Sequence, residues 1–546
     1  MPIPIIDLFA GPGGLGEGFS SLLDKKDDRI FDIKLSIEKD LNAHETLRLR
    51  SFYRKFPVGQ APEAYYEILR AKTWKKRKEL IDKLKDRFNE EWQTADKEAW
   101  CFELPYPEEF DKKGSKKGGY TPAQILERNK LIDVRIEEQL DGQTEFVLIG
   151  GPPCQAYSLA GRSRNQWTEG LDKNDHRVDL YKQYLRIIAK HQPSVFVMEN
   201  VKGLLSAKVE EEKVFPWILR DLKNPSSVFK EYNSSGYKIY SLSTAPVKCD
   251  ESGNPQYSAA RDYLIRAEDF GIPQARHRVI LLGIRDDIDV CPLPLIKEES
   301  VGLKEIIGDL PKIRSGLSKK YLFSKTVYKD GEEKEKRYYE PIKDSPEKWF
   351  ETVSGFRNEI GSWNGLEISP KEEVPRDIGG EFIKFNTPKN SNPLYEWYND
   401  DRLEGVLNHE SRSHLYQDIF RYQFLSIYSD IYDRFPRLEE FKDYHDDLVP
   451  NHKNADSGKF SDRFRVQLGD YPATTITSHI SKDGHYFIHY DPIQCRSLTV
   501  REGARIQTFP DNYLFCGTRT QQYHQVGNAV PPFVAYQIAD IVSKII

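Results

Sequence analysis

Residues 146–158 read Phe-Val-Leu-Ile-Gly-Gly-Pro-Pro-Cys-Gln-Ala-Tyr-Ser, a short apolar run followed at once by a rigid turn. The apolar run predicts a buried strand, and Pro152 and Pro153 restrict the backbone that leads to Cys154. Ligands of open α/β sheets bind at the carboxyl ends of the strands. The sequence therefore places this cysteine where a ligand would bind, although a buried inert thiol is the alternative for the residue taken alone.

Further apolar runs bounded by polar residues occur at 3–9, 34–37, 195–198 and 278–283. They are separated by helical stretches, which is typical of a largely parallel sheet covered on both faces. The fold class predicted from this pattern is α/β.

The chain of 546 residues is long enough for two or three domains. We expect an α/β domain over 1–290, with a charged surface insertion at about 51–130. The rhythm of strands and helices is lost in the region that follows, which predicts a second, irregular domain over 291–515. A C-terminal segment, 516–546, is expected to return to the first domain.

Composition excludes several classes of protein. Charged residues make up 30% of the chain, with no apolar run long enough to span a membrane and no apolar leader, so we expect a cytoplasmic protein. The six cysteines contain no CxxC pair, which argues against a disulfide framework and predicts no metal site. The net charge of −5 does not exclude nucleic acid, because a local basic face suffices.

Residues 7–16, Asp-Leu-Phe-Ala-Gly-Pro-Gly-Gly-Leu-Gly, join the first expected strand to a helix. Such a turn presents backbone N–H groups and a helix N-terminus to a ligand. The glycine spacing departs from GxGxxG, and no GK[ST] follows, so a P-loop is excluded. A dinucleotide, a nucleotide and S-adenosylmethionine all remain possible ligands, and Glu38 at the end of the second strand can accept hydrogen bonds from a ribose diol.

Three other groups lie at strand ends and complement the cysteine. Glu199 closes one apolar run, and Arg276 and Arg278 stand at the start of another. A thiolate attacks electron-poor carbon, a carboxyl group can hold a proton at a ring nitrogen, and arginine can bind a ring carbonyl. Together with Cys154 these residues suit conjugate addition to a pyrimidine.

The chain resembles the DNA cytosine-C5 methyltransferases. The resemblance rests on ordered blocks that cover roughly 1–50, 130–290 and 460–546. These blocks are Asp7–Gly11 through Phe19, Gly151–Ser158, Met198–Val201, Pro273–Arg278, Arg496–Pro510 and Gln525–Val530.

The resemblance implies a Rossmann-like sheet that uses S-adenosyl-L-methionine, with a smaller target-recognition domain over 291–515 that includes Arg496–Pro510. Cys154 would add to C6 of a cytosine, and Glu199 would bind its N3 edge. Arg278, supported by Arg276, would contact O2 and the active-site loop.

For the cofactor, the resemblance implies that Phe9 stacks on the adenine and that Glu38 binds the ribose hydroxyls. Asp133, which follows an apolar pair shortly before the cysteine strand, is the candidate for the adenine amino group. The full set of predicted cofactor residues is Phe9, Ala10, Gly11, Pro12, Gly13, Gly14, Glu38, Asp133, Pro153, Leu180, Asn528 and Val530.

The implied substrate is double-stranded DNA, with the target base flipped out of the helix because C5 and C6 are inaccessible in a stacked duplex. Residues 158–179 would form a mobile loop that closes over it. We expect a monomer, in a restriction-modification or related system with a cognate endonuclease. Two alternatives are a relative acting on RNA, which the long 290–460 segment disfavours, and a catalytically silent DNA-binding protein, which the presence of Cys154, Glu199 and both arginines disfavours.

Overall fold

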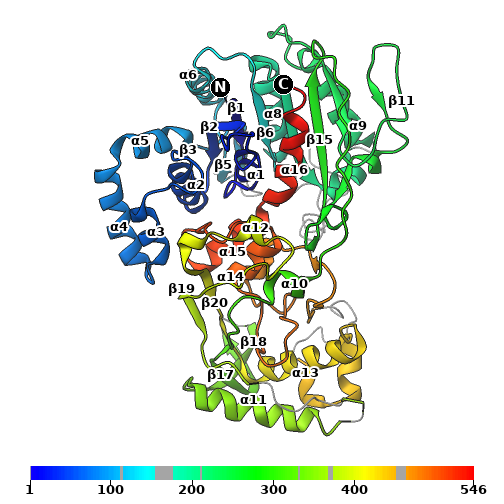
Figure 1. The fold of residues 1–546 in the computed structure, drawn as a ribbon. Helices are drawn as coiled ribbons and strands as arrows, with labels where there is room; N and C mark the ends of the chain where they lie inside the picture. The colour runs from blue at the N-terminus through cyan, green and yellow to red at the C-terminus, as the bar shows by residue number, and fades with distance from the viewer. Residues whose placement is uncertain are drawn as a thin grey trace.

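The structure, a computed structural model, describes residues 2–110, 115–153, 176–209, 212–329, 332–363, 365–366, 373–450 and 463–546. They form two lobes stacked one above the other (Figure 1). The upper one, here the sheet lobe, comprises residues up to about 300 and the C-terminal residues from 529. The lower one, here the second lobe, comprises the residues between them.

An eight-stranded sheet organises the sheet lobe (Figure 1). Five neighbouring strands run parallel, and β15 runs antiparallel to both of its neighbours, β7 and β10. The strand order is β10 (Tyr237–Ser241), β15 (His277–Arg285), β7 (Val195–Val201), β6 (Val147–Gly150), β1 (Ile3–Leu8), β2 (Phe31–Glu38) and β3 (Ala99–Cys101), with β13 (Leu264–Arg266) also paired to β15. The predicted, largely parallel α/β sheet is confirmed.

Both faces of this sheet are buried, which explains the continuous apolar runs of its strands. Alternate residues point to opposite faces, so Ile6 and Leu148 pack in one core while Ile5 and Val147 pack in the other. The first core is covered by α6 (Pro122–Leu140), α8 (His176–His191) and α9 (Val214–Lys223), and the second by α1 (Gly14–Ser20) and α16 (Pro532–Val542).

The antiparallel direction of β15 brings its first residues to the edge of the sheet where the parallel strands end. Parallel strands place their carboxyl ends at one edge of the sheet, and an antiparallel strand places its start at that same edge. Arg278, at the start of β15, is accordingly in register with Val201 at the end of β7.

The second lobe is a mixture of short strands and helices around two cores. A long hairpin, β17 (Lys319–Lys329) with β18 (Glu332–Pro341), and the helices α11 (Pro346–Ile360) and α13 (Tyr416–Tyr432) form its lower part (Figure 1). The part nearest the sheet lobe contains α10 (Leu303–Ile307), β19 (Gly379–Lys384), α12 (Tyr395–Tyr398), β20 (Gly405–Glu410), β22 (Ala473–Thr474), α14 (Val500–Ile506) and α15 (Arg519–Asn528).

The predicted C-terminal segment, 516–546, starts too early. Tyr523 and Val526 of α15 belong to the core of the second lobe, together with Leu498 and Phe509. The chain returns to the sheet lobe only near Val530, whose side chain packs in the core between the sheet and α16.

The predicted insertion at about 51–130 is also wrong in its bounds. β3, at 99–101, is a strand of the central sheet, and α2 (Leu41–Arg54) packs beside it. The true excursion consists of α3 (Glu63–Arg70), α4 (Trp74–Arg87) and α5 (Asn89–Glu98) and is here called the helical insertion. It does not only cover the sheet lobe but also reaches down beside β19 and β20 (Figure 1).

None of the helices in the described ranges is long and apolar enough to cross a membrane.

Close packing of α16 against α1 gives a prediction for Gly18. A Cβ atom at this position would lie 2.5 Å from Ala535 Cβ and closer still to the Pro532 carbonyl oxygen. We expect Gly18→Ala to lower the free energy of unfolding by about 1–3 kcal/mol in urea denaturation, because overpacking outweighs helix propensity. The matched change Gly355→Ala, in α11 with nothing within 4 Å, should raise it by up to about 1 kcal/mol. Equal effects at both glycines would contradict the packing argument.

Candidate active site

A cavity of about 430 Å³ lies where the two lobes meet. From the sheet lobe it is lined at the carboxyl ends of β1, β2, β6 and β7 and at the start of β15, and from the second lobe it is lined by α15. Seven predicted cofactor residues and three predicted catalytic residues line it: Phe9, Gly11, Pro12, Glu38, Pro153, Leu180, Asn528, Glu199, Arg276 and Arg278. Cys154 and most of the predicted loop at 158–179 lie outside the described residues.

The glycine-rich turn after β1 has a special backbone. Phe9 has φ of 58°, Gly11 of 58° and Gly13 of 94°, all in the left-handed region. A non-glycine residue in this region is strained, and such strain clusters at functional sites. A Cβ added at Gly11 would meet no atom within 4 Å, so the turn leaves open space beside its backbone. The Tyr513 hydroxyl of the second lobe donates a hydrogen bond to the Pro12 carbonyl and holds this turn from below.

Glu38 ends β2 and fixes the neighbouring backbone. Its carboxylate accepts hydrogen bonds from Gly11 N and Asp40 N, each 2.8 Å long. Burial raises the pKa of Glu38 above its ordinary value, while these two N–H donors counteract part of that shift. Each carboxylate oxygen has a second lone pair, so Glu38 can still accept hydrogen bonds from a ligand in the cavity.

Glu199 and Arg278, two predicted catalytic residues, form an ion pair. Arg278 Nε lies 2.8 Å from Glu199 Oε1, and both side chains are mostly buried. The neighbouring residue Asn200 donates a hydrogen bond from Nδ2 to the Pro152 carbonyl, at 3.3 Å. The end of β7 is thereby tied to the turn that leads to Cys154, and the ion pair faces the same cavity as that turn.

Arg276 has a different environment from Arg278. It is 2% exposed and donates from Nη1 to the backbone carbonyls of Ile476, at 3.0 Å, and Gly527, at 3.4 Å. Burial, together with the nearby Arg278, lowers the pKa of Arg276 well below its usual range. Both carbonyls belong to the second lobe, so Arg276 connects the lobes at the edge of the cavity in addition to lining it.

Five predicted cofactor residues are not among those that line the cavity: Ala10, Gly13, Gly14, Asp133 and Val530. Gly14 and Val530 have a packing role instead, because any Cβ at Gly14 would overlap the Val530 carbonyl oxygen. Ala10 N donates to the Ile37 carbonyl at 3.1 Å and so fixes the turn to β2.

Asp133, the predicted partner of the adenine amino group, lies within helix α6 and does not line the cavity. Its carboxylate binds Arg186 Nη1 at 2.8 and 3.0 Å and His191 Nε2 at 3.0 Å. Burial alone would raise the pKa of Asp133, but His191 and Arg186 hold it below its ordinary value. The buried residues of α6 recur every four positions, at Ile132, Ile136 and Leu140, and this spacing is the signal that identifies a helix here.

The residues that follow β3 line the cavity and were missed by the sequence analysis. Phe102, Glu103 and Leu104 lie at the carboxyl end of this edge strand, next to Glu38, whose carbonyl accepts a hydrogen bond from Phe102 N at 3.0 Å. The Glu103 carboxylate accepts from Lys39 Nζ and the Tyr120 hydroxyl, both at 3.0 Å. The sequence signal for these residues is an acidic residue, Glu103, after a short apolar run. That run lies within the insertion predicted at about 51–130.

His524 of α15 is a second cavity residue that the sequence analysis missed. Its Nε2 lies 2.9 Å from Ser481 Oγ, which itself donates to the Ser478 carbonyl at 2.7 Å. Because the Ser481 proton is used in that bond, His524 Nε2 is the donor, and in a neutral ring Nδ1 is left as an acceptor.

Comparisons with known proteins identify the family. The family model described as C-5 cytosine-specific DNA methylase matches residues 120–544. The type II methyltransferase M.Bpa9945I of Bacillus paralicheniformis is 31% identical over 99% of each chain. The type II methyltransferase M.DdeI of Desulfomicrobium norvegicum is 26% identical over 72% of each chain. A solved E. coli prophage protein, described as a DNA modification methyltransferase, aligns over 100% of this chain and 99% of its own at 18% identity and a TM-score of 0.46.

The ion pairs of Asp133 predict a stabilising role remote from the cavity. We expect Asp133→Asn to lower the free energy of unfolding by about 1–3 kcal/mol at pH 7, because the buried Arg186 loses its counter-charge and the hydrogen bond to His191 loses its charged partner. A carboxyl group whose pKa is depressed by folding stabilises the fold above its unfolded pKa, and this contribution is lost as the pH falls through the folded value. The difference between wild type and variant in urea denaturation should therefore shrink below about pH 4. A difference that is constant with pH would contradict this assignment.

Proposed function

Because this chain belongs to the C-5 cytosine-specific DNA methylase family and is a DNA (cytosine-5-)-methyltransferase, we propose that it methylates C5 of a flipped-out cytosine through a covalent adduct. The observation that carries this proposal is the Glu199–Arg278 ion pair beside the Pro152–Pro153 turn, in the same cavity as the glycine-rich turn. The Glu199 carboxyl group and the Arg278 cation therefore lie beside the turn that precedes Cys154 in the sequence.

The residues of the cavity fit S-adenosylmethionine as methyl donor. Gly11 leaves open space beside its backbone, the Phe9 ring is available for stacking, and Glu38 has free lone pairs for a ribose diol. Glu103, just after β3, lines the cavity where Asp133 does not. We therefore propose that Glu103, in place of Asp133, accepts a hydrogen bond from the adenine amino group. When bound, the cofactor supplies a methyl group on a positively charged sulfur.

In the proposed reaction Cys154 Sγ forms a bond to C6 of the cytosine, and the electron pair of the C5–C6 double bond becomes available at C5. Glu199 holds a proton at N3, which withdraws electrons from the ring during the attack. Its Oε1 is engaged by Arg278, which leaves Oε2 for the base. After C5 has taken the methyl group, loss of the C5 proton restores the double bond and expels the Cys154 thiolate.

Arg278 has two roles in this scheme. Its ion pair keeps Glu199 in one orientation, and its remaining N–H groups can donate to the O2 atom of the base, where negative charge develops. A side chain held on a sheet strand by an ion pair is preorganised for this task, because little reorientation is needed in the transition state.

The second lobe is proposed to read the DNA sequence, since a duplex bound between the lobes would present its groove to this lobe and its flipped base to the cavity. Extrusion of the base costs a few kcal/mol, which contacts to both lobes must offset. The names of the similar type II methyltransferases favour a restriction-modification system. We further propose a cognate endonuclease and a monomeric enzyme that acts on double-stranded DNA.

A duplex carrying 5-fluorocytosine at its target site tests the covalent step, because fluorine cannot leave as a proton does. We expect the wild-type protein with cofactor to form an adduct that survives a denaturing gel, and Cys154→Ser to form none. Cys249→Ser, at an exposed cysteine, is the matched control and should behave as wild type. The absence of any adduct with DNA would favour the silent alternative, and an adduct with RNA alone would favour an RNA substrate. Base-resolution methylation sequencing of a host expressing the protein identifies the target.

The raised pKa of Glu38 gives a second test. Cofactor binding needs the ionised carboxylate as acceptor, so affinity measured by calorimetry should fall as the pH is lowered through that pKa. Glu38→Gln should weaken binding about 10–100-fold at pH 7.5, since hydrogen bonds to charged groups contribute about 1.5–3 kcal/mol, and should flatten the pH dependence. Glu79→Gln, on the exposed face of α4, serves as control. A pH profile unchanged by Glu38→Gln would exclude this role.

A further inference from the structure

We propose that the helical insertion, α3 to α5, is a brace that holds the second lobe over the cavity, and that Arg77 is its central positioning residue. The chain passes between the lobes near residues 300 and 529, and β14 (Gln274–Ala275) pairs with β22 on that side. Figure 1 shows the insertion at the opposite side of the junction, directly above β19 and β20. The two lobes are thus joined at both ends of their interface.

Arg77 is the strongest polar link of the brace. It is 1% exposed, and its Nη1 lies 2.6 Å from Glu381 Oε2 of β19. Its Nη2 donates to the Glu381 carbonyl at 3.1 Å, and Asn408 Nδ2 of β20 donates to the same carboxylate oxygen at 3.0 Å. A guanidinium that contacts both the side chain and the backbone of one residue fixes position as well as charge.

A second group of bonds runs in both directions across the same boundary. Arg402 of the second lobe donates to the Gly59 carbonyl at 3.0 Å and the Ala61 carbonyl at 2.6 Å. In return, Arg70 of α3 donates to the Arg402 carbonyl at 2.5 Å, and the Tyr66 hydroxyl lies 2.7 Å from Asp400 Oδ2. Reciprocal contacts of this kind resist both sliding and opening of the interface.

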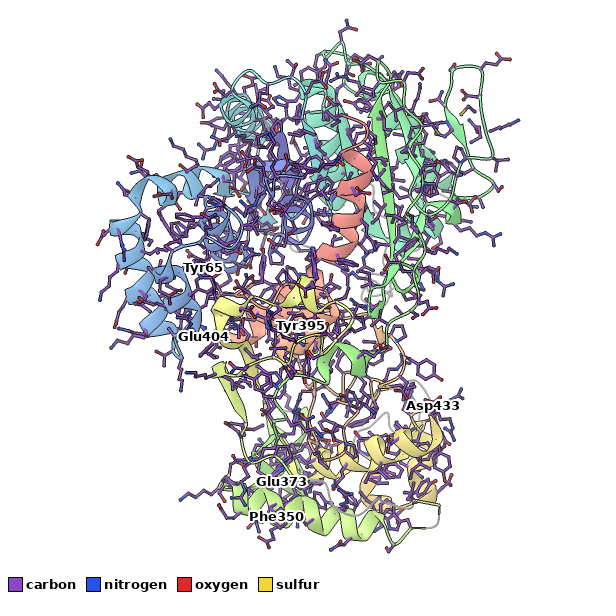
Figure 2. All side chains as sticks on the ribbon, viewed as in Figure 1. Tyr65, Phe350, Glu373, Tyr395, Glu404 and Asp433 are labelled. Carbon is purple, nitrogen blue, oxygen red and sulfur yellow. The ribbon has the colours of Figure 1, made fainter. Side chains whose placement is uncertain are left out.

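The brace also shares an apolar core with the second lobe. In Figure 2, Tyr65 marks the insertion, and Glu404 marks the second-lobe segment just below it. A single buried cluster combines residues of the insertion and the second lobe with residues of α2: Leu49, Phe52, Ala61, Tyr65, Tyr66, Ile68, Leu69, Ile81, Leu84, Trp92, Ala95, Phe382, Leu403, Leu407, Leu514 and Cys516. Because one continuous core spans the boundary, the two parts are expected to move together.

At its other end the brace is anchored to the sheet lobe. Arg54, the last residue of α2, and Lys55, which follows it, both bind Glu98, the last residue of α5, at 2.5 and 2.6 Å, and Glu98 is 3% exposed at its side chain. These partners hold the pKa of Glu98 at about 2 against the effect of burial, so the ion pairs persist at neutral pH. Helix α2 begins at Leu41, soon after Glu38 ends β2, and a rigid path therefore leads from the Glu38 side of the cavity to β19.

A different role for the insertion would be direct binding of DNA phosphates through the exposed basic residues of α4, such as Lys75 and Lys78. The two roles make different demands on neighbouring residues. A brace depends on the buried Arg77 and not on the exposed lysines, whereas a phosphate-binding face depends on the lysines and weakens with salt.

The experiment compares Arg77→Met and Lys78→Met in the full chain. For Arg77→Met we expect the KM for target DNA to rise at least tenfold, with kcat within threefold and cofactor affinity within twofold of wild type. Amide hydrogen exchange of β19 and β20 should accelerate at least tenfold, while the central sheet stays protected. Lys78→Met should leave all four quantities within twofold. This exchange readout does not need methylation activity, so it tests the brace even if the proposed function fails.

Arg402→Ala is the second variant, because Arg402 is partly exposed and its removal leaves no buried charge behind. It should reproduce the KM effect and the faster exchange in weaker form. The brace is overturned if both variants keep wild-type KM and wild-type exchange in β19 and β20. It is also overturned if Lys78→Met raises KM as much as Arg77→Met does, with a lower salt dependence of DNA binding, because the insertion would then bind phosphate directly.

Discussion

Residues 274–278 hold the two lobes together and also position Arg278 and its partner Glu199 in the cavity. Gln274 is fully buried, accepts a hydrogen bond from Ile476 N at 2.6 Å and donates to the Gln507 side chain at 2.9 Å. Arg276 holds two further carbonyls of the second lobe, and Arg278, two residues on, binds Glu199. Any displacement of the second lobe would therefore also move Arg278, the cation beside the cavity. Because the same segment holds the lobes together and carries Arg278, the arrangement of the lobes determines the geometry of the cavity.

The sequence could predict the acid and the cation of the site because strand ends determine where they lie. Glu199 closes a parallel strand and Arg278 opens an antiparallel one, and sheet geometry brings these two ends to a single edge. The glycine-rich turn was predictable for a similar reason, since a strand followed by glycines and a helix has few possible conformations. The local sequence pattern was sufficient to predict the position of a residue wherever that position is set by the strand to which the residue belongs.

Prediction failed where position depends on a distant partner. β3 has only three residues and becomes a strand of the sheet through pairing with β2, so nothing in its local sequence separates it from the charged helices around it. Glu103, which follows it, was missed for that reason. The helical insertion was expected on the surface of the sheet lobe, but its apolar residues pack against Phe382, Leu403 and Leu407, which are distant in the sequence. Asp133 differs, because the spacing of Ile132, Ile136 and Leu140 in the sequence already indicates a helix there.

The charges around the cavity are unbalanced in a way that suits the proposed reaction. Arg276 is buried beside Arg278 with no carboxylate within 4 Å among the described residues, and its Nε has no hydrogen-bond partner among them. A buried unpaired cation destabilises a fold, and such a cost is expected where charge develops during a reaction. In the proposed reaction, addition of a thiolate to a pyrimidine would bring negative charge onto the ring at this edge of the sheet. Arg278 compensates Glu199, and the field of Arg276 would then be left to stabilise the charged adduct.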